Sequence, residues 1–305
     1  MSRNGILVVG SANMDMVVVT KTLPQPGETL LGDKFAMFPG GKGANQAVCC
    51  GKLGGKVYFI GKMGKDVFRS RLMQSMQRDG VNLQHLLSDA HAPTGVALIN
   101  VDACGQNVIV VVSGSNMKLT PDDVRRKRQV FAKVSVLLLQ LEIPLATVVE
   151  AVRLAKRQGV AIVLNPAPAR ALPRSLLRLV DFLTPNEIEA ELLTGVPVRD
   201  CAAAEKAARQ LLSSGVKNVI ITLGDKGCLL VNAQRTESFP AFRVRAVDTT
   251  AAGDAFNGGL ALSLAEGRTI DEAIGFASSV AAYAVTKMGA QSSMPTKAEL
   301  RKFLA

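Results

Sequence analysis

Short apolar runs and amphipathic stretches alternate along most of the chain, and their order predicts an α/β protein. Residues 5–10 form one apolar run closed by a glycine, which is typical of a strand buried on both faces. From residue 135 the alternation is regular. Strands are expected at 135–140, 160–164, 181–184 and 217–223, and helices at 144–158, 173–180, 186–194 and 202–214. This order predicts a doubly wound, mostly parallel sheet with helices on both faces.

Two segments, residues 13–36 and 94–115, interrupt this alternation because they contain extended stretches but no crossover helix. Residues 94–101 and 107–113 predict a β-hairpin. We expect the two segments to pair as a small β-sheet lid over the carboxyl ends of the core strands, where such sheets bind ligands. The predicted nucleotide- and substrate-binding core is residues 1–12, 37–93 and 116–305.

Composition supports one large domain and narrows the class of partner. The chain has 305 residues, of which 48% are hydrophobic, so a sizeable core is available. Aromatic residues make up only 4%, which disfavours a surface that stacks on bases. The formal net charge is +11, and its densest cluster, residues 125–128, lies in a predicted amphipathic helix. A solvated helix face explains that cluster better than a nucleic-acid site, so no nucleic-acid partner is expected.

Cysteine usage and apolar run lengths indicate the compartment. The five cysteines include no C-x-x-C pair and leave an odd one out, as in a reduced chain. No apolar run approaches the roughly 20 residues that span a bilayer, and the first run is too short for a signal core. A cytoplasmic protein without a membrane partner is expected.

A glycine-rich segment opens a predicted helix at residues 40–45 (GGKGAN). Glycines there let the backbone approach a polar ligand, and the helix start offers free N–H groups. The segment satisfies neither the P-loop pattern nor the Rossmann pattern. From the residues alone, a structural role and a ligand-binding role stay equally open.

A second helix start carries an acid, in the segment DTTAAGDAF at residues 248–256. Small residues ahead of a helix aim successive amides at one point, which suits the charge on a transferred phosphoryl group. Asp254 then has two interpretations. It is either a favourable acid at the positive end of a helix dipole or a general base beside an anion hole.

Other candidates follow strand ends. Asn186 and Glu189 form N-x-x-E at a helix start, where a cap is the simpler reading and a Mg²⁺ site with its waters is the alternative. The glycine-rich turn at 222–227 is either a ligand-binding loop or only a turn. Asn13, Asp15 and Glu142 follow two strands and, if those strands are neighbours, would line a hydroxyl-binding pocket. Taken singly, each of the three is an ordinary loop residue.

Seven segments together resemble the phosphofructokinase-B (ribokinase-like) family of sugar and nucleoside kinases. The resemblance runs end to end, and GGKGANQ followed by DTxxAGD is highly specific. It implies a ribokinase-like α/β body with a β-sheet lid, and transfer of the ATP γ-phosphate to O5 of D-ribose. The segments are GSANMD (10–15), PGGKGANQA (39–47), LNPAPA (164–169), TPNEIEAE (184–191), ITLGDKG (221–227), AVDTTAAGDAFNGG (246–259) and GAQSSMP (289–295).

The resemblance also implies roles for matching positions. Asp254 is the expected base, and the amides of Ala251, Ala252 and Gly253 form the anion hole. The expected sugar contacts are Asn13, Asp15, Gly41, Lys42, Asn45 and Glu142, with Asp254. The expected nucleotide contacts are Asn186, Thr222, Leu223, Gly224, Asp225, Lys226, Gly227, Gly253 and Ser278.

Two cations and a second copy of the chain are further implications of the resemblance. Glu189 would organise Mg²⁺ through water, and the lid would form a homodimer interface. A monovalent cation, typically K⁺, would be held at Asp248, Thr250, Ala284, Lys287, Gly289 and Ser293.

The chain departs from the family pattern at two positions. Many members have glycine where this chain has Ala251, which should be tolerated if its φ is negative. Relatives can have a larger residue, such as histidine, at Ser278, which makes the nucleotide preference harder to infer.

The alternatives are a kinase for 2-deoxyribose or a nucleoside, and a catalytically silent sugar sensor. Asn13 favours a sugar with a 2-hydroxyl, since relatives that prefer deoxyribose replace it with an apolar residue.

Overall fold

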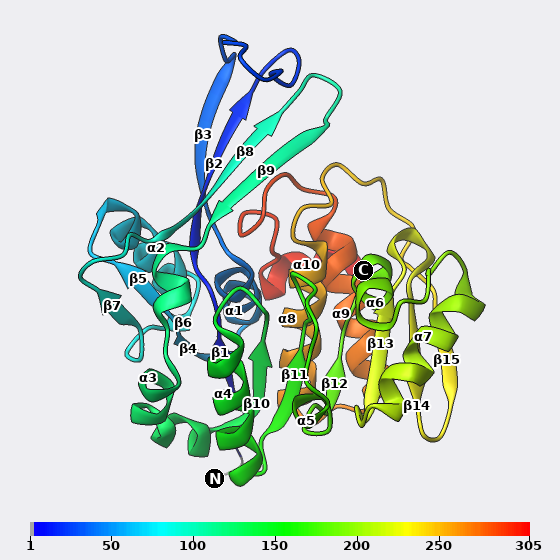
Figure 1. Cartoon of the computed structure of the whole chain (residues 1–305). Helices are drawn as coiled ribbons and strands as arrows, with labels where there is room; N and C mark the ends of the chain where they lie inside the picture. Colours follow the sequence, from blue (N-terminus) through cyan, green and yellow to red (C-terminus); the bar gives the residue numbers. More distant parts are fainter. Residues whose placement is uncertain (1–2) are drawn as a thin grey trace.

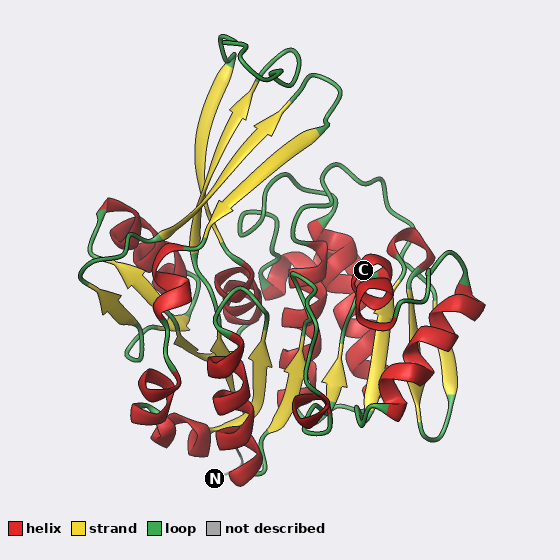
Figure 2. Ribbon diagram, viewed as in Figure 1, coloured by secondary structure: helices red, strands yellow, loops and turns green. Residues whose placement is uncertain are grey.

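A mostly parallel sheet of nine strands forms the centre of the computed structural model, which describes residues 3–305 (Figures 1 and 2). The prediction of a doubly wound α/β core is confirmed. Strands β14 and β15 are antiparallel to their neighbours and close one edge. The sheet order is β15 (Thr236–Phe239), β14 (Cys228–Asn232), β13 (Asn218–Thr222), β12 (Phe182–Leu183), β11 (Ala161–Leu164), β10 (Val134–Leu139), β1 (Gly5–Val9), β4 (Lys56–Ile60) and β6 (Val81–Asn82).

Successive side chains of the central strands belong alternately to two separate hydrophobic cores, one on each face of the sheet. In β1, Leu7 and Val9 face one core, whereas Ile6 and Val8 face the other. This explains why the run is apolar without interruption. The first core is covered by α3 (Pro121–Arg126), α4 (Leu145–Arg157), α5 (Arg174–Leu177), α6 (Glu187–Thr194) and α7 (Cys201–Ser213). The second is covered by α1 (Lys42–Lys52), α2 (Val67–Arg78), α8 (Ala252–Ala265), α9 (Ile270–Ala284) and α10 (Lys297–Leu304).

Two adjacent glycines let α8 approach both of its neighbouring helices. A Cβ at Gly258 would lie 2.7 Å from Cys49 Sγ of α1, and one at Gly259 would lie 3.0 Å from Ala277 Cα of α9. Both distances are shorter than ordinary carbon contacts, so larger residues would push the helices apart. This close approach brings the N-terminus of α8 to the N-terminus of α1.

The predicted lid is a separate sheet that projects from the body (Figure 1). Its order is β3 (Lys34–Gly40), β2 (Asn13–Val19), β8 (Gly95–Val101) and β9 (Asn107–Val112). The antiparallel pairing of β8 with β9 confirms the hairpin. Strand β3 continues to Gly40, four residues beyond the expected lid boundary at 36, because it stays paired with β2 as far as Asn13.

Some predicted elements were wrong in extent. The helix expected at 173–180 is only Arg174–Leu177, because residue 181 already pairs with strand β11: its amide donates to Ile162 O at 3.1 Å. The strand expected at 181–184 is only Phe182–Leu183. A two-stranded sheet of β5 (Lys62–Gly64) and β7 (Leu87–Asp89) was not predicted.

Within residues 3–305, every helix is too short or too polar to cross a bilayer.

Candidate active site

The site lies where the order of the central sheet reverses. Strands β1 and β10 are neighbours, but the chain proceeds from β1 toward β4 and from β10 toward β11, on opposite sides. Such a switch point leaves a crevice beyond the carboxyl ends of the strands. Ser11 follows β1 and donates its hydroxyl to Glu142, which follows β10. The predicted meeting of Asn13, Asp15 and Glu142 at one sheet edge therefore has its structural basis here.

The start of α1 is closed, because protein groups already occupy its free amides. The amide of Lys42 donates to Glu142 Oε2 at 3.0 Å, and those of Gly43 and Ala44 donate to Ser11 Oγ and Ser11 O at 3.3 and 2.8 Å. A carboxylate at a helix N-terminus is favoured by the helix dipole. The N-terminus of α1 therefore binds a carboxylate of the protein itself, that of Glu142.

The glycines ahead of α1 are required by packing. Gly41 has φ 86°, and a Cβ there would lie 2.7 Å from Asn13 N. A Cβ at Gly40 would overlap the Asp15 carboxylate. Together these close approaches press the 39–45 segment against strand β2 and keep Asn13 and Asp15 in the crevice.

Asp254 lies in the first turn of α8, only 5% exposed, and faces α1. Asn45 Nδ2 donates to Asp254 Oδ2 and Gln46 Nε2 donates to Asp254 Oδ1, each at 2.9 Å. Asn45 Oδ1 is buried without a hydrogen-bond partner among residues 3–305. An unpaired buried oxygen beside a carboxylate suits a pocket that receives hydroxyl groups.

Several carboxylates surround one lysine in this crevice. Burial alone would lower the pKa of Lys42, but the charges of Asp254, Glu142, Glu189 and Asp15 outweigh it and raise that pKa. Burial, with Glu142 and Asp254 nearby, raises the pKa of Asp15 to about 7. Burial also raises the pKa of Glu189, against a backbone hydrogen bond from Asn186 and the charge of Lys42. The site therefore combines one partly buried cation with two acids, Asp15 and Glu189, whose pKa values are raised mainly by burial.

The amides at the start of α8 are open, in contrast to those of α1. Ala252 N donates to Thr249 O at 3.2 Å, but no acceptor within residues 3–305 pairs with the amides of Ala251, Gly253 or Asp254. A Cβ at Gly253 would meet nothing within 4 Å. Amides that converge on open space beside an acid form a ready site for an anion.

Ala251 corrects one expectation. Its φ is +60°, in the left-handed region, not negative as its tolerance was expected to require. The physical reason is that the chain must turn sharply here to aim the first amides of α8 at one point. An alanine in this conformation carries strain of about 1–2 kcal/mol relative to the right-handed region.

The predicted nucleotide residues lie on two adjoining loops. Asn186 and Thr222 form an isolated β-bridge, and Thr222 N donates to Pro185 O at 3.0 Å. The turn at 222–227 closes through Leu223 N and Gly227 O at 2.8 Å. It contains Gly224, Asp225 and Lys226, whereas Ser278 of α9 lies against the thiol of Cys228 at the start of β14.

The simpler reading of N-x-x-E also holds. Asn186 Oδ1 accepts from Glu189 N at 2.8 Å, and Glu189 Oε2 accepts from Asn186 N at 2.9 Å, so the pair caps α6. The influence of Lys42 and Asp254 on the pKa of Glu189 places its side chain near the crevice as well. The cap leaves Glu189 Oε1 free for a further contact.

Asp248 joins the two loops expected to hold a monovalent cation. Its Oδ1 accepts from Thr250 N and its Oδ2 from Gly289 N, both at 2.8 Å. Lys287 N donates to Ala284 O at 3.1 Å, and Ser293 Oγ donates to Ala290 O at 2.8 Å, so the second loop is folded on itself. Loops that present backbone and hydroxyl oxygens fit a hard cation. No group of three or more His, Cys, Asp or Glu in the described part of the chain forms a metal cluster.

Sequence reasoning assigned no role to several residues that shape the site. Asn116, which follows the lid, donates to Asn13 Oδ1 at 2.7 Å and accepts from Ala12 N at 3.0 Å, and so orients Asn13. Gln46, Gln140 and Asn165 are buried amides near Asp254. A glutamine two positions after Ala44 and one before Ala47 in a helix, as in GANQAV, was the available signal for Gln46.

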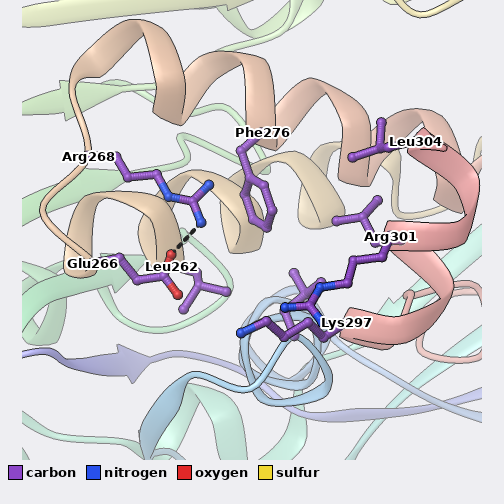
Figure 3. A pocket seen from close by; sticks show the side chains of 9 residues that line it. Leu262, Glu266, Arg268, Phe276, Lys297, Arg301 and Leu304 are labelled. Atoms are coloured by element: carbon purple, nitrogen blue, oxygen red, sulfur yellow. Dashed lines mark hydrogen bonds and ion pairs between the residues drawn. The ribbon is translucent and has the colours of Figure 1, made fainter.

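A cavity of about 260 Å³ between α8, α9 and α10 is not this site (Figure 3). It is lined in part by Leu262 and Glu266, about 12 and 18 Å beyond Asp254 along the helix axis. Figure 3 shows Arg268 paired with Glu266 and lying near Phe276. None of the predicted site residues lines it.

Comparisons with known proteins agree with this geometry. The profile of the pfkB family carbohydrate kinases matches residues 3–297. A ribokinase of Haemophilus influenzae is 44% identical over 302 residues, 99% of each chain. A deoxyribokinase of Salmonella typhi is 39% identical over 301 residues, 98% of each chain. The solved structure of Arabidopsis thaliana ribokinase complexed with ribose and ATP superposes with a TM-score of 0.93 at 34% identity, covering 100% of this chain and 99% of that one.

Proposed function

Because the chain belongs to the pfkB family of carbohydrate kinases, we propose that it phosphorylates D-ribose at O5 with ATP, yielding D-ribose 5-phosphate and ADP. The observation that carries this proposal is the position of Asp254. Its carboxylate stands beside open amides at the start of α8 and faces the crevice of Asn13, Asp15 and Lys42. A base and an anion hole next to a polar pocket are what transfer of a phosphoryl group to an alcohol requires.

In the reaction, the O5 hydroxyl gives its proton to Asp254 as the bond from O5 to phosphorus forms. The bond from phosphorus to the leaving oxygen of ADP breaks, and the open amides of Ala251 and Gly253 stabilise the charge on the transferred group. Lys42 adds a positive charge. The sugar hydroxyls are held by Asn13, Asp15, Gly41, Lys42, Asn45 and Glu142.

ATP is proposed to lie over the two adjoining loops, against Asn186 and the 222–227 turn, with Ser278 near the base. Glu189 would hold Mg²⁺ through water, and Mg²⁺ would neutralise phosphate charge. A K⁺ ion held around Asp248 would fix the shape of the loop that carries the anion hole. Asp248 supports this assignment because it ties that loop to Gly289.

The lid is proposed to form a homodimer with a second copy. Strand β9 is an edge strand, and its residues 108–112 are all apolar and 49–55% exposed. A long apolar edge of this kind is normally covered. Sedimentation velocity should show a dimer that Val110→Lys converts to a monomer.

A cytoplasmic location is also proposed. Its support is five unpaired cysteines, three of them buried, as in chains that stay in reducing surroundings.

The function is tested with Asp254→Asn in a coupled assay of ADP release. Turnover of ribose should fall at least about 1,000-fold because the base is lost, while ribose binding by calorimetry should stay within about threefold. A variant that keeps the parent's kcat would refute the proposed mechanism. Running the assay with and without K⁺ tests the cation.

Substrate choice is tested in the same assay with 2-deoxyribose and nucleosides. Asn13 is buried and its Oδ1 is already paired with Asn116, so a sugar that lacks the 2-hydroxyl leaves the Asn13 Nδ2 group unpaired at a cost of about 1–3 kcal/mol. We expect kcat/KM for ribose to exceed that for 2-deoxyribose by at least about tenfold. Equal values would contradict the assignment to ribose, which matters because a deoxyribokinase is among the similar proteins.

A further inference from the structure

A chain of buried side-chain amides is hydrogen-bonded to the base, and none of the residues that carry these amides is a predicted ligand contact. Gln46 Nε2 donates both to Asp254 Oδ1 at 2.9 Å and to Asn165 Oδ1 at 3.1 Å. Gln46 Oε1 accepts from Gln140 Nε2. Gln46 and Gln140 are 0% exposed and Asn165 is 6% exposed, so water has little access to these bonds.

The chain continues back to the residue before the base. Asn165 Nδ2 donates to Thr184 O at 3.2 Å, and Thr184 Oγ1 donates to Asn257 Oδ1 at 2.6 Å. Asn257 Nδ2 then donates to Gly253 O at 2.8 Å. The hydrogen bonds thus form a closed ring that starts at the carboxylate of Asp254 and ends at the adjoining carbonyl.

The direction of every bond in this ring is fixed by its two ends. An ionised carboxylate and a backbone carbonyl only accept hydrogen bonds. Gln46 must therefore present its NH₂ group to Asp254, and Asn257 must present its NH₂ group to Gly253. The ring joins the ends of β11 and β12 to α1 and α8, and Gln140 ties Gln46 to the end of β10, so the carboxylate is held to the rigid sheet.

We propose that Gln46 is the positioning residue of the kinase reaction: it anchors Asp254 Oδ1 and leaves Oδ2 as the oxygen that accepts the substrate proton. Asn45, the only described partner of Oδ2 among residues 3–305, has an unpaired oxygen of its own and lies at the crevice. Its amide can move to a sugar hydroxyl and release Oδ2, whereas the donor on Oδ1 is locked in the ring. This inference rests on the proposed function, and it assigns different tasks to the two carboxylate oxygens of Asp254.

The test compares Gln46→Leu with the parent enzyme. Leucine fills a similar volume but donates nothing, so Asp254 loses its anchor. We expect kcat to fall about 100-fold, as for a misplaced catalytic group, with KM for ribose within about threefold. The charged groups around Asp254, namely Asp15 of β2, Lys42 of α1 and Glu189 of α6, are the same in both proteins.

A second variant keeps the test decisive if Gln46→Leu does not fold. In Gln46→Glu the new carboxyl group donates to Oδ1 when neutral and repels Asp254 when ionised. Its kcat relative to the parent at the same pH should be about tenfold higher at pH 6 than at pH 8. A purely structural glutamine would give the same ratio at both pH values.

Thr147→Val is the matched control. It removes a buried hydrogen bond, from Thr147 Oγ1 to Leu119 O at 2.6 Å, on α4 at the opposite core. Its Tm should fall while kcat and the pH profile stay at the parent's values.

The inference would be overturned if Gln46→Leu kept kcat within about threefold of the parent, or if it changed only KM. The proposed function is judged separately, by Asp254→Asn. Loss of turnover in Asp254→Asn with full activity in Gln46→Leu would refute the role of Gln46 alone.

Discussion

The two helix starts that face each other across the site look alike in sequence but are opposite in structure. At the start of α1, the amides are filled by Ser11 and Glu142, and the glycines are packed against strand β2. At the start of α8, three amides have no acceptor within residues 3–305, and Gly253 faces open space. Helix starts rich in small residues thus serve either to let protein segments interlock or to leave room for a ligand. Which one applies is decided by what lies ahead of the helix.

The largest effect on stability should come from adding a methyl group at Gly41, at the start of α1. Gly41→Ala forces an L-residue into φ 86° and places its Cβ 2.7 Å from Asn13 N. We expect the free energy of unfolding to fall by about 3 kcal/mol, measured by urea titration. A fall below about 1 kcal/mol would show that the start of α1 is not as tightly packed as described.

Glu142→Gln should weaken the closed start from the other side. The variant keeps the size of the side chain but removes the charge that the N-terminus of α1 binds. A loss of about 1–2 kcal/mol in unfolding free energy is expected, together with weaker ribose binding. An unchanged stability would mean that the helix dipole and its amides do not depend on this carboxylate.

Gly253→Ala is the corresponding change at the open start. Its stability should stay within about 1 kcal/mol of the parent, because a Cβ there meets nothing within 4 Å. The methyl group enters the space of the transferred phosphoryl group, so kcat should fall about tenfold with little change in KM for ribose. Equal kcat in both proteins would mean that the phosphoryl group does not pass there.

The raised pKa of Asp15 predicts that the free energy of unfolding depends on pH. The folded pKa of Asp15 is about 7 against an ordinary 3.8, so the folded protein binds a proton that the unfolded chain has released in this window. Asp15 therefore contributes to the free energy of unfolding at low pH, and this contribution is lost as the pH rises through 7. Relative to Asp15→Asn, the parent's unfolding free energy should decline between pH 4 and 7.

Ribose gives a second measurement on the same group. If its hydroxyls donate to ionised Asp15, binding must release protons at pH 6. Calorimetry in two buffers of different ionisation enthalpy should detect this release in the parent and not in Asp15→Asn.

The smallest expected effect is a gain in stability from a change at the start of α8. Ala251→Gly relieves the positive φ of the alanine, so stability should rise by about 0.5–1 kcal/mol with kcat within about twofold. Ala252→Gly is the matched control, since residue 252 is helical and the same change there should cost about 0.5–1 kcal/mol. A loss of stability in both variants would contradict the strain at residue 251.

Periodicity predicted the fold well where packing follows directly from local pattern. Strand β1 and the hairpin of β8 and β9 could be read from their residues because burial on two faces and a polar turn leave clear signatures. The one-turn helix α5 and the small sheet of β5 and β7 could not be read, because both depend on contacts between distant segments.

The site was found by its motifs rather than by physics alone. Asp254 had two even interpretations until the segments were read together as a family pattern. Gln46 and Asn116 were assigned no role because nothing local distinguishes an amide that orients a neighbour from one that fills space. Only the distances across α1, α8 and the lid reveal that task.

The amino-acid sequence by itself determined that strands and helices alternate, that polar groups follow the strand ends, and that small residues precede two helices. These features depend on neighbours in the chain, so they are written locally. Tertiary structure decided which helix start is closed by Glu142 and which is open beside Asp254. It did so because a free amide is defined by the absence of a nearby acceptor, and the acceptors at the start of α1 come from residues 32 and 100 positions away.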